Sequence, residues 1–316
     1  MKKILFARPL PQEVTRALVG CDVTVRAETA PLGADELRAA LRDYDAVMPT
    51  LGDGFTAEVF ADVPEPRCKL LANFGVGYNH IDVEAARAAG VAVTNTPGAV
   101  TDATADIAMT LMLMSARRAG EGERLVRSGA WEGWHPTQML GLHLTGKKVG
   151  IVGMGRIGQA IAQRCHFGFG MEVSYFNRSA KDLAFPAARV ESLAALAGKV
   201  DVLVVAVPGG SETRHMIDAQ VLAAMQPHAR LVNIARGDVV QEAALIDALQ
   251  AGQIGGAGLD VYEFEPQVPQ ALRDLENVVL LPHLGTSARE VRVDMGLMVV
   301  ANLQAFIEGK PLPNKV

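Results

Sequence analysis

The chain has 316 residues, of which 49% are hydrophobic, and its formal net charge at pH 7 is −5. This length fits two domains better than one, and the hydrophobic content is sufficient for sizeable cores. The acidic balance argues against nucleic acid or an anionic membrane surface as the main partner.

The cysteines and the apolar runs indicate a cytoplasmic protein with no membrane partner. Cys21, Cys68 and Cys165 are odd in number and far apart, with no CxxC pattern or metal-ligand cluster, so we expect free thiols and no metal site. The apolar run near the amino terminus is interrupted by Arg8, which favours a first strand over a signal peptide. No apolar run approaches the roughly 18 residues that span a bilayer.

Residues 2–97 alternate short β-rich runs with amphipathic segments, which predicts a parallel, doubly wound sheet of about five strands. Strands are expected at residues 3–7, 22–25, 46–49, 69–74 and 91–94, and helices near residues 12–19, 34–42, 57–61 and 83–89. The first turn carries Arg8 and two prolines instead of a Gly-rich phosphate loop. We therefore do not expect this domain to hold a nucleotide.

The loop at residues 73–82 contains two glycines and a histidine. Gly75 and Gly77 could present backbone N–H groups to a carboxylate as a small anion nest. A tight loop that needs positive φ explains these glycines equally well. His80 has no evident catalytic partner, so we expect it to form a structural hydrogen bond.

Residues 100–115 predict a helix that is apolar on nearly every face, and we expect it to be buried between the domains. An irregular stretch at residues 131–136 follows and holds both tryptophans of the chain, Trp131 and Trp134. We interpret this stretch as a surface arm that packs on a second subunit.

A second β/α series begins at residue 146 with a short β-branched run and the pattern Gly153-x-Gly155-x-x-Gly158. Gly153 permits a tight turn, Gly155 lets backbone approach a pyrophosphate, and Gly158 lets the following helix pack on the strand. The pattern alone is weak evidence, but the strand before it and the helix after it together indicate a dinucleotide site at a helix N-terminus.

Five further strands are expected at residues 172–176, 202–207, 230–234, 256–261 and 278–281, which makes six parallel strands, as in a dinucleotide-binding domain. Helices are expected between these strands, including one at residues 242–251. A last helix at residues 288–307 is long enough to return to the first domain. The predicted fold class is therefore α/β, with two doubly wound parallel-sheet domains and a cleft between them. We expect residues 1–99 and 288–316 to form a flavodoxin-like substrate domain, and residues 100–287 to form a Rossmann coenzyme domain.

The second strand of the coenzyme domain ends with Asn177 where the usual fingerprint has an acid that binds the ribose 2′-hydroxyl. Arg178, Ser179 and Lys181 follow and can bind a 2′-phosphate through charge-assisted hydrogen bonds. If Arg178 is instead a solvated surface residue, NAD(H) binds. The sequence favours NADP(H), and NAD(H) stays possible.

Three ionisable residues follow the later strands, and ligands of open α/β sheets lie beyond the carboxyl ends of the strands. Arg236 can hold the carboxylate of a 2-keto acid in bidentate fashion. His283 can donate a proton to the developing alkoxide, and Glu265 beside it would favour the charged imidazolium. Each residue is weak evidence alone, but together they predict one reaction site.

The chain resembles the D-isomer-specific 2-hydroxyacid dehydrogenase family. The resemblance rests on the ordered motifs that end at Gly158, Gly237, Pro266 and Gly285, and it spans nearly the whole chain. Residues 73–82, residues 101–106 and the pair Asn177 and Arg178 are most similar to NADP-dependent glyoxylate/hydroxypyruvate reductases.

The resemblance implies that Arg236, Glu265 and His283 are catalytic, with His283 the proton donor, and that the substrate is bound by Val76, Gly77, Arg236 and His283. It also implies a homodimer. Together with the glycine fingerprint it implies cofactor contacts at Thr104, Gly153, Gly155, Arg156, Ile157, Gly158, Asn177, Arg178, Ser179, Val207, Pro208, Thr213, Ile234, Ala235, Arg236, Asp260, His283 and Gly285. Relatives often carry Leu-Thr-Pro where this chain has Gly209, Gly210 and Ser211, which puts side-chain contacts there in doubt.

The predicted function is NADPH-preferring reduction of small 2-keto acids, with glyoxylate and hydroxypyruvate favoured, to D-2-hydroxy acids. One alternative is a 3-phosphoglycerate dehydrogenase, although the loop at residues 74–78 carries no cation for a phosphate. Another is a nicotinamide-sensing binding protein of the corepressor type, which shares the fold and the catalytic residues. The sequence leaves the physiological substrate and the reaction direction open.

Overall fold

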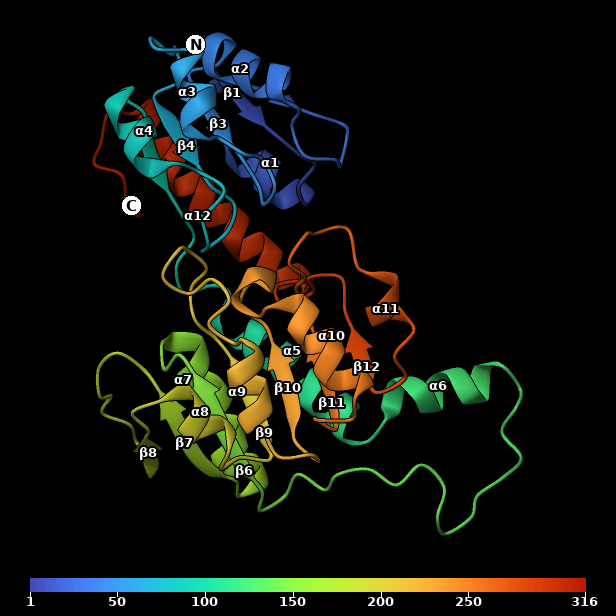
Figure 1. Cartoon of the computed structure of the whole chain (residues 1–316). Helices are drawn as coiled ribbons and strands as arrows, with labels where there is room; N and C mark the ends of the chain where they lie inside the picture. Colours follow the sequence, from blue (N-terminus) through green and yellow to red (C-terminus); the bar gives the residue numbers. More distant parts are fainter. The chain divides into compact units, whose positions relative to one another are not determined.

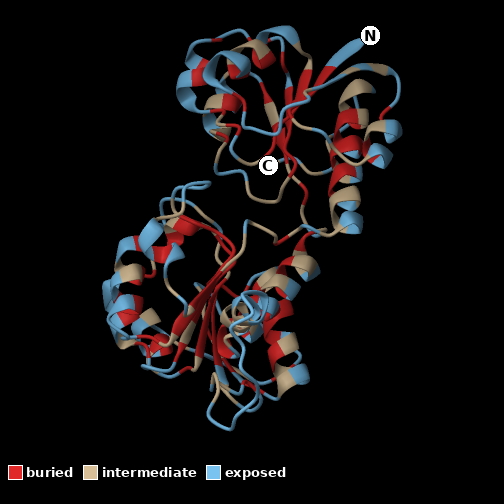
Figure 2. Ribbon diagram, turned by 90° about the vertical axis from the view of Figure 1, so that its right-hand side faces the viewer, coloured by how far each residue is buried: buried red, intermediate tan, exposed pale blue.

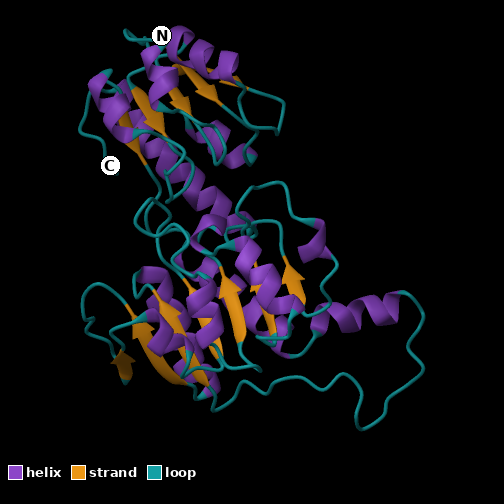
Figure 3. Ribbon diagram, in the orientation of Figure 1, coloured by secondary structure: helices purple, strands orange, loops and turns teal.

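The computed structural model describes all 316 residues, and the chain divides into two compact units. Unit 1 comprises Met1–Val100 and Ser287–Val316, and unit 2 comprises Thr101–Thr286. Helices and strands alternate along the chain in both units (Figures 1 and 3). No helix combines the length and the apolar character that crossing a membrane requires.

Unit 1 is built on a five-stranded parallel sheet with the order β2-β1-β3-β4-β5, which is a doubly wound, flavodoxin-like order and confirms the predicted fold class. Its strands are β1 (Lys2–Phe6), β2 (Cys21–Val25), β3 (Ala46–Met48), β4 (Leu70–Ala72) and β5 (Ala92–Thr94). Its helices are α1 (Gln12–Ala17), α2 (Ala34–Asp43), α3 (Ala57–Ala61), α4 (Val83–Ala88) and α12 (Arg289–Ile307).

The sheet of unit 1 is covered by helices that come from both ends of the chain. Leu41 of α2, Phe60 of α3 and Ala86 of α4 share one apolar cluster with strand residues. Helix α12 packs on β4 and on α1, where Gly296 leaves room for the side chain of Val14. The buried strands lie between these layers in Figure 2.

Unit 2 contains a seven-stranded parallel sheet with the order β12-β11-β10-β9-β6-β7-β8. Its strands are β6 (Lys148–Val152), β7 (Glu172–Phe176), β8 (Ala187–Arg189), β9 (Val202–Val205), β10 (Arg230–Asn233), β11 (Gly256–Leu259) and β12 (Val278–Leu280). The prediction of six strands was wrong because β8 has only three residues, lies at the sheet edge and is partly exposed. The strand order reverses between β6 and β9, which is the switch point where dinucleotides bind in this fold.

Helices cover both faces of the second sheet. One apolar cluster joins it to α8 (Leu193–Ala197), α9 (Ala219–Ala224), α10 (Glu242–Gln250) and α11 (Gln270–Arg273). Another joins it to α5 (Thr101–Ala116) and to α7 (Arg156–Gln163), which continues as a π-helical turn at Arg164–Gly168. Helix α6 (Ala119–Arg127) was not predicted, and it buries none of its residues. In Figure 1, α6 and the loop that follows it extend away from the sheet of unit 2.

Candidate active site

The glycine loop between β6 and α7 leaves open space at the helix N-terminus. Gly153 has φ of 97°, and a Cβ there would lie 2.7 Å from the carbonyl oxygen of Ala206. A Cβ on Gly158 would lie 2.0 Å from the carbonyl oxygen of Gly153, so the helix could not start so close to the turn. Gly155 is the N-cap of α7, and a Cβ there would have no atom within 4 Å. The free N–H groups of this helix end therefore suit a diphosphate.

The end of β7 presents an amide and cations in place of an acid. Asn177 Oδ1 accepts a hydrogen bond from the N–H of Met154 at 3.2 Å, which ties this residue to the glycine loop. Arg178 and Ser179 are exposed. Arg189 of β8 donates to the carbonyl oxygens of Asn177 and Arg178 at 3.2 and 3.4 Å. The sequence reasoning missed Arg189 because the strand that carries it was not recognised.

Arg236 follows β10 in a turn that is fixed by Asn233. Asn233 accepts a hydrogen bond from the N–H of Ala235 at 3.0 Å and donates to the carbonyl oxygen of Arg236 at 2.9 Å. A Cβ on Gly209 would lie 2.6 Å from Cγ of Arg236, so this glycine makes room for the arginine side chain. Burial lowers the pKa of Arg236, and the nearby carboxylates of Glu265 and Asp238 oppose that shift.

His283 and Glu265 form a hydrogen-bonded pair. His283 Nδ1 lies 2.9 Å from Glu265 Oε2, and the N–H of Tyr262 donates to Oε1 of the same glutamate at 3.0 Å. About 30% of each side chain is exposed. Burial alone would raise the pKa of Glu265, but the His283 hydrogen bond and positive charge, with the Tyr262 N–H, hold this pKa below its usual value. No hydrogen bond occupies Nε2 of His283, which is left for another partner.

Asp260 fixes the turn that carries His283. It is 1% exposed, and its two carboxylate oxygens accept hydrogen bonds from the N–H groups of Leu284 at 2.6 Å and Gly285 at 2.8 Å. Its carbonyl oxygen accepts from the N–H of His283 at 3.0 Å. Burial raises the pKa of Asp260 despite these donors. Thr104 Oγ1 donates to the carbonyl oxygen of Gly285 at 3.2 Å, so α5 also anchors this turn.

The other predicted cofactor positions lie in the first turn of α7 and in the loops after β9 and β10. Thr213 folds the loop after β9 on itself by donating to the carbonyl oxygen of Pro208 at 2.8 Å. Arg156 and Pro208 are exposed. Partly or fully buried are Ile157, Val207, Ile234 and Ala235.

A second histidine–carboxylate pair, which the sequence reasoning missed, supports the loop of Glu265. His215 Nε2 lies 2.7 Å from Glu263 Oε1, and Glu263 Oε2 accepts from the N–H of Glu242 at 3.3 Å. Glu242 in turn accepts from the N–H of Glu263 at 3.3 Å. The only signal for this arrangement was that Glu263 stands two residues before Glu265.

The loop at residues 73–82 of unit 1 holds its carbonyl groups with side-chain amides. Asn73 Nδ2 donates to the carbonyl oxygens of Gly75 and Gly77, each at 3.0 Å, and Asn95 Nδ2 donates to that of Val76 at 2.9 Å. The N–H of Gly75 is bonded to the Asn73 carbonyl oxygen, so it cannot contribute to the expected nest. The N–H groups of Val76 and Gly77 have no hydrogen-bond partner in the protein. His80 Nε2 lies 3.0 Å from Asn73 Oδ1, the structural role that we predicted.

The chain matches a family profile described as "D-isomer specific 2-hydroxyacid dehydrogenase, NAD binding domain" over residues 109–285. It is 44% identical over 321 aligned residues to the glyoxylate reductase of Thermococcus kodakarensis, covering 99% of this chain and 96% of that protein. It is 38% identical to the glycerate dehydrogenase of Hyphomicrobium methylovorum, covering 93% of this chain and 92% of that protein.

Solved structures give the same assignment. An NADPH-dependent glyoxylate/hydroxypyruvate reductase from Sinorhizobium meliloti, in complex with NADP and malonate, superposes with a TM-score of 0.85 and 37% identity. This match covers 100% of this chain and 96% of that one. The chain therefore belongs to the D-isomer specific 2-hydroxyacid dehydrogenase family and is an oxidoreductase.

Proposed function

We propose that the protein reduces small 2-keto acids to D-2-hydroxy acids with NADPH, and that glyoxylate and hydroxypyruvate are its substrates. The observation that carries the proposal is the 2.9 Å hydrogen bond between His283 Nδ1 and Glu265 Oε2, next to the Arg236 turn. Glyoxylate reductases that are 40–44% identical over 99% of this chain support the substrate class.

Each of the three residues has a separate task in the proposed reaction. The bound nicotinamide supplies a hydride to the carbonyl carbon of the keto acid. Arg236 holds the substrate carboxylate through its planar fork and sets the carbonyl in place. His283 Nε2 gives a proton to the carbonyl oxygen as negative charge develops there. Glu265 accepts the Nδ1–H hydrogen bond, which fixes the ring orientation and stabilises the charged imidazolium. In unit 1, we assign the unpaired N–H groups of Val76 and Gly77 to carboxylate binding.

The preference for NADPH is proposed from the end of β7. Asn177 brings no negative charge, and the exposed Arg178 supplies a cation directly after it. Arg189 supplies a second cation, which donates to the carbonyl oxygens of Asn177 and Arg178 and also pairs with Glu191 at 3.3 Å. A guanidinium binds a 2′-phosphate through charge-assisted hydrogen bonds that a 2′-hydroxyl cannot match. A solved relative with NADP in its complex supports this preference.

Paired titrations of NADPH and NADH test this preference. Arg178→Ala should weaken NADPH binding by about tenfold, equivalent to about 1.4 kcal/mol, and leave NADH binding nearly unchanged. Arg273→Ala is the matched control because Arg273 is also exposed and has no ion pair in the structure. Equal effects of Arg178→Ala on the two cofactors would remove Arg178 from the 2′-phosphate site.

A panel of 2-keto acids tests the substrate assignment. We expect kcat/KM with NADPH to be highest for glyoxylate and hydroxypyruvate, and much lower for phosphorylated 3-phosphohydroxypyruvate. Tight NADPH binding with no turnover of any panel member would refute catalysis and favour a nicotinamide sensor. A preference for the phosphorylated acid would instead favour the phosphoglycerate reaction.

We also propose that the protein is a cytoplasmic homodimer. Large apolar side chains are exposed along α6 and the loop that follows it, namely Val126 at 61%, Trp131 at 51%, Trp134 at 80% and Leu140 at 68%. Exposed tryptophans in one segment are typical of subunit interfaces. All three cysteines are free, as is usual in a reducing compartment.

A further inference from the structure

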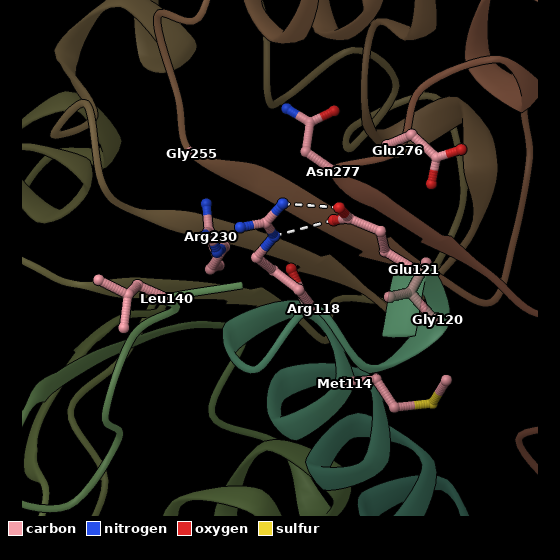
Figure 4. A pocket seen from close by; sticks show the side chains of 11 residues that line it. Met114, Arg118, Gly120, Glu121, Leu140, Arg230, Gly255, Glu276 and Asn277 are labelled. Carbon is pink, nitrogen blue, oxygen red and sulfur yellow. Dashed lines mark hydrogen bonds and ion pairs between the residues drawn. The ribbon is translucent and has the colours of Figure 1, made fainter. Parts of the chain in front are cut away.

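A cavity of about 330 Å³ lies in unit 2 at the amino ends of β10, β11 and β12 (Figure 4). The glycines of the cofactor loop follow the carboxyl end of β6, so the cavity lies at the opposite end of the parallel strands. Its lining includes Ser115 at the end of α5, Arg118 just after that helix and Arg230 at the start of β10. None of the residues that we assign to cofactor or substrate lines this cavity.

Arg230 brings an uncompensated positive charge to the cavity. Its Nε and Nη1 atoms are buried and have no hydrogen-bond partner, and it forms no ion pair. A Cβ on Gly255 would lie 2.0 Å from Nη1, so the glycine leaves the space that the guanidinium occupies. A guanidinium is charged at every physiological pH, and burial of an unpaired charge is unfavourable. The arrangement therefore lacks a negative partner for Arg230.

The acids around the cavity are already engaged with other arginines. Glu121 forms two hydrogen bonds with Arg118, at 2.8 and 2.6 Å, and Figure 4 shows both of them. Glu276 pairs with Arg124. Burial lowers the pKa of Arg230, and the charge of Arg118 lowers it further. A second buried donor, Ser115 Oγ, also lines the cavity and has no hydrogen-bond partner.

We propose that Arg230 and Ser115 form a binding site for an oxyanion, either a phosphate or a carboxylate, that is separate from the active site. The guanidinium fork matches the geometry of both oxyanions and binds them with two parallel hydrogen bonds. The serine hydroxyl adds a third donor. The oxyanion comes either from free solution or from a carboxylate of a second copy of this chain, and the two sources are separable by experiment.

Calorimetry with inorganic phosphate tests the free source. The full chain is titrated in the presence of saturating NADP⁺, which fills the diphosphate cradle, and sodium chloride keeps the ionic strength constant. Arg230→Met should weaken phosphate binding by about tenfold or more relative to wild type, because it removes the fork and keeps the apolar stem. Arg273→Met, in which an exposed arginine receives the same change, should bind phosphate as wild type does. Any phosphate bound at Arg236 is common to all three proteins, so it cancels in the comparison.

Sedimentation velocity of the same proteins tests the second source. If phosphate affinity is the same in all three proteins but Arg230→Met self-associates at least about tenfold more weakly, the oxyanion belongs to a second copy. Equal phosphate affinity and equal self-association of Arg230→Met and Arg273→Met would overturn the proposal. NADP⁺ affinity reports whether Arg230→Met is folded. If Arg230→Met is not folded, Arg230→Lys and Ser115→Ala replace it. Each of them should bind phosphate more weakly or self-associate more weakly than wild type. If both match Arg273→Met in phosphate affinity and in self-association, the proposal is overturned.

Discussion

His283 stands in a turn whose geometry is imposed by its neighbours. Its φ is 55°, in the left-handed region that residues other than glycine adopt rarely and at a cost. Asp260 holds the turn by accepting hydrogen bonds from the N–H groups of Leu284 and Gly285, and its carbonyl oxygen accepts from His283 itself. Glu265 then fixes the ring through Nδ1. The position of the imidazole is thus fixed both by the backbone turn of His283 and by the hydrogen bond of its side chain.

Replacement of the proposed proton donor tests its role. We expect His283→Ala to lower kcat for glyoxylate by about 10²-fold or more, as is typical when a general acid is lost. His228→Ala is the control: His228 also pairs with a carboxylate, Asp201, but lies at the amino edge of the sheet. This control should change kcat by less than about twofold, as a surface substitution does. A similarly small effect of His283→Ala would mean that another group donates the proton.

The lowered pKa of Glu265 leads to a prediction about stability and pH. A carboxyl group whose pKa is lower in the folded protein contributes stability above its unfolded pKa of about 4.3, and loses it as the pH falls through the folded value. The wild type should therefore exceed Glu265→Gln in unfolding free energy above about pH 5, and this difference should shrink between about pH 5 and pH 3. Denaturant unfolding across this range measures it. If the difference in unfolding free energy between wild type and Glu265→Gln stayed constant across this pH range, the lowered pKa of Glu265 would be contradicted.

At the level of single residues, the sequence indicated which side chains follow the strands but not what surrounds them. Arg236, Glu265 and His283 could be chosen because polar residues after parallel strands gather at one sheet edge. The space that Gly209 leaves for Arg236 depends on loop conformation, which no short sequence pattern specifies. The contact of His215 with Glu263 joins residues 48 positions apart through two loops, so it could not be predicted either.

Among the elements, helix α5 buries much of its apolar surface against the second sheet. Leu111 is 0% exposed and lies against Gly258 of β11, where a Cβ would come within 2.9 Å of the leucine Cβ. The same helix positions Thr104, which donates to the carbonyl oxygen of Gly285. Packing of α5 and the shape of the His283 turn are therefore linked.

Truncation of Leu111 should destabilise the protein strongly. Leu111→Ala should lower the free energy of unfolding by about 2–5 kcal/mol, because it removes apolar contacts and leaves a cavity. Leu113→Ala on the same helix is the matched control, since Leu113 is 39% exposed and should cost less than about 1 kcal/mol. Equilibrium unfolding in urea measures both. Similar losses for the two variants would show that the interior face of α5 is not closely packed.

Element positions were predictable where burial imposes a pattern on the sequence. The predicted helix at residues 57–61 matches α3, and the predicted long helices lie within one residue of α5 and α12 at each end. Helix α6 was missed because it contains Gly120 and Gly122, which are unfavourable inside a helix, and because it buries none of its residues. Strand β8 was missed because it has only three residues and is partly exposed at the sheet edge.

For the whole molecule, the alternation of β and α segments was enough to predict two parallel sheets. Strand order could not be read from this alternation, because each sheet contains one pair of neighbours, β1 with β3 and β6 with β9, that is not consecutive along the chain. The oligomeric state is also a property of surfaces, and the sequence indicated it only through the apolar residues of the arm and through the family resemblance.

The proposed homodimer can be tested by measuring self-association of the protein. Trp131 and Trp134 are the only tryptophans, so intrinsic fluorescence reports directly on this segment. We expect wild-type emission to shift to shorter wavelength as the protein concentration rises and a dimer forms. The double variant Trp131→Ser and Trp134→Ser, followed by sedimentation velocity, should dissociate at concentrations about tenfold higher or more. If the double variant and the wild type dissociate alike, the arm is not part of the interface.

Unit 1 is interrupted in the sequence, because Thr101–Thr286 stands between its two segments. Met295, Val299 and Leu303 of α12 belong to its buried core, and Gly296 packs on Val14. During synthesis, the first hundred residues therefore leave the ribosome before the helix that completes their core exists. Unit 2, which has its own sheet, leaves the ribosome while the sheet of unit 1 still lacks this helix. Any chain that stops short of residue 289 would keep that apolar face open to chaperones and to aggregation.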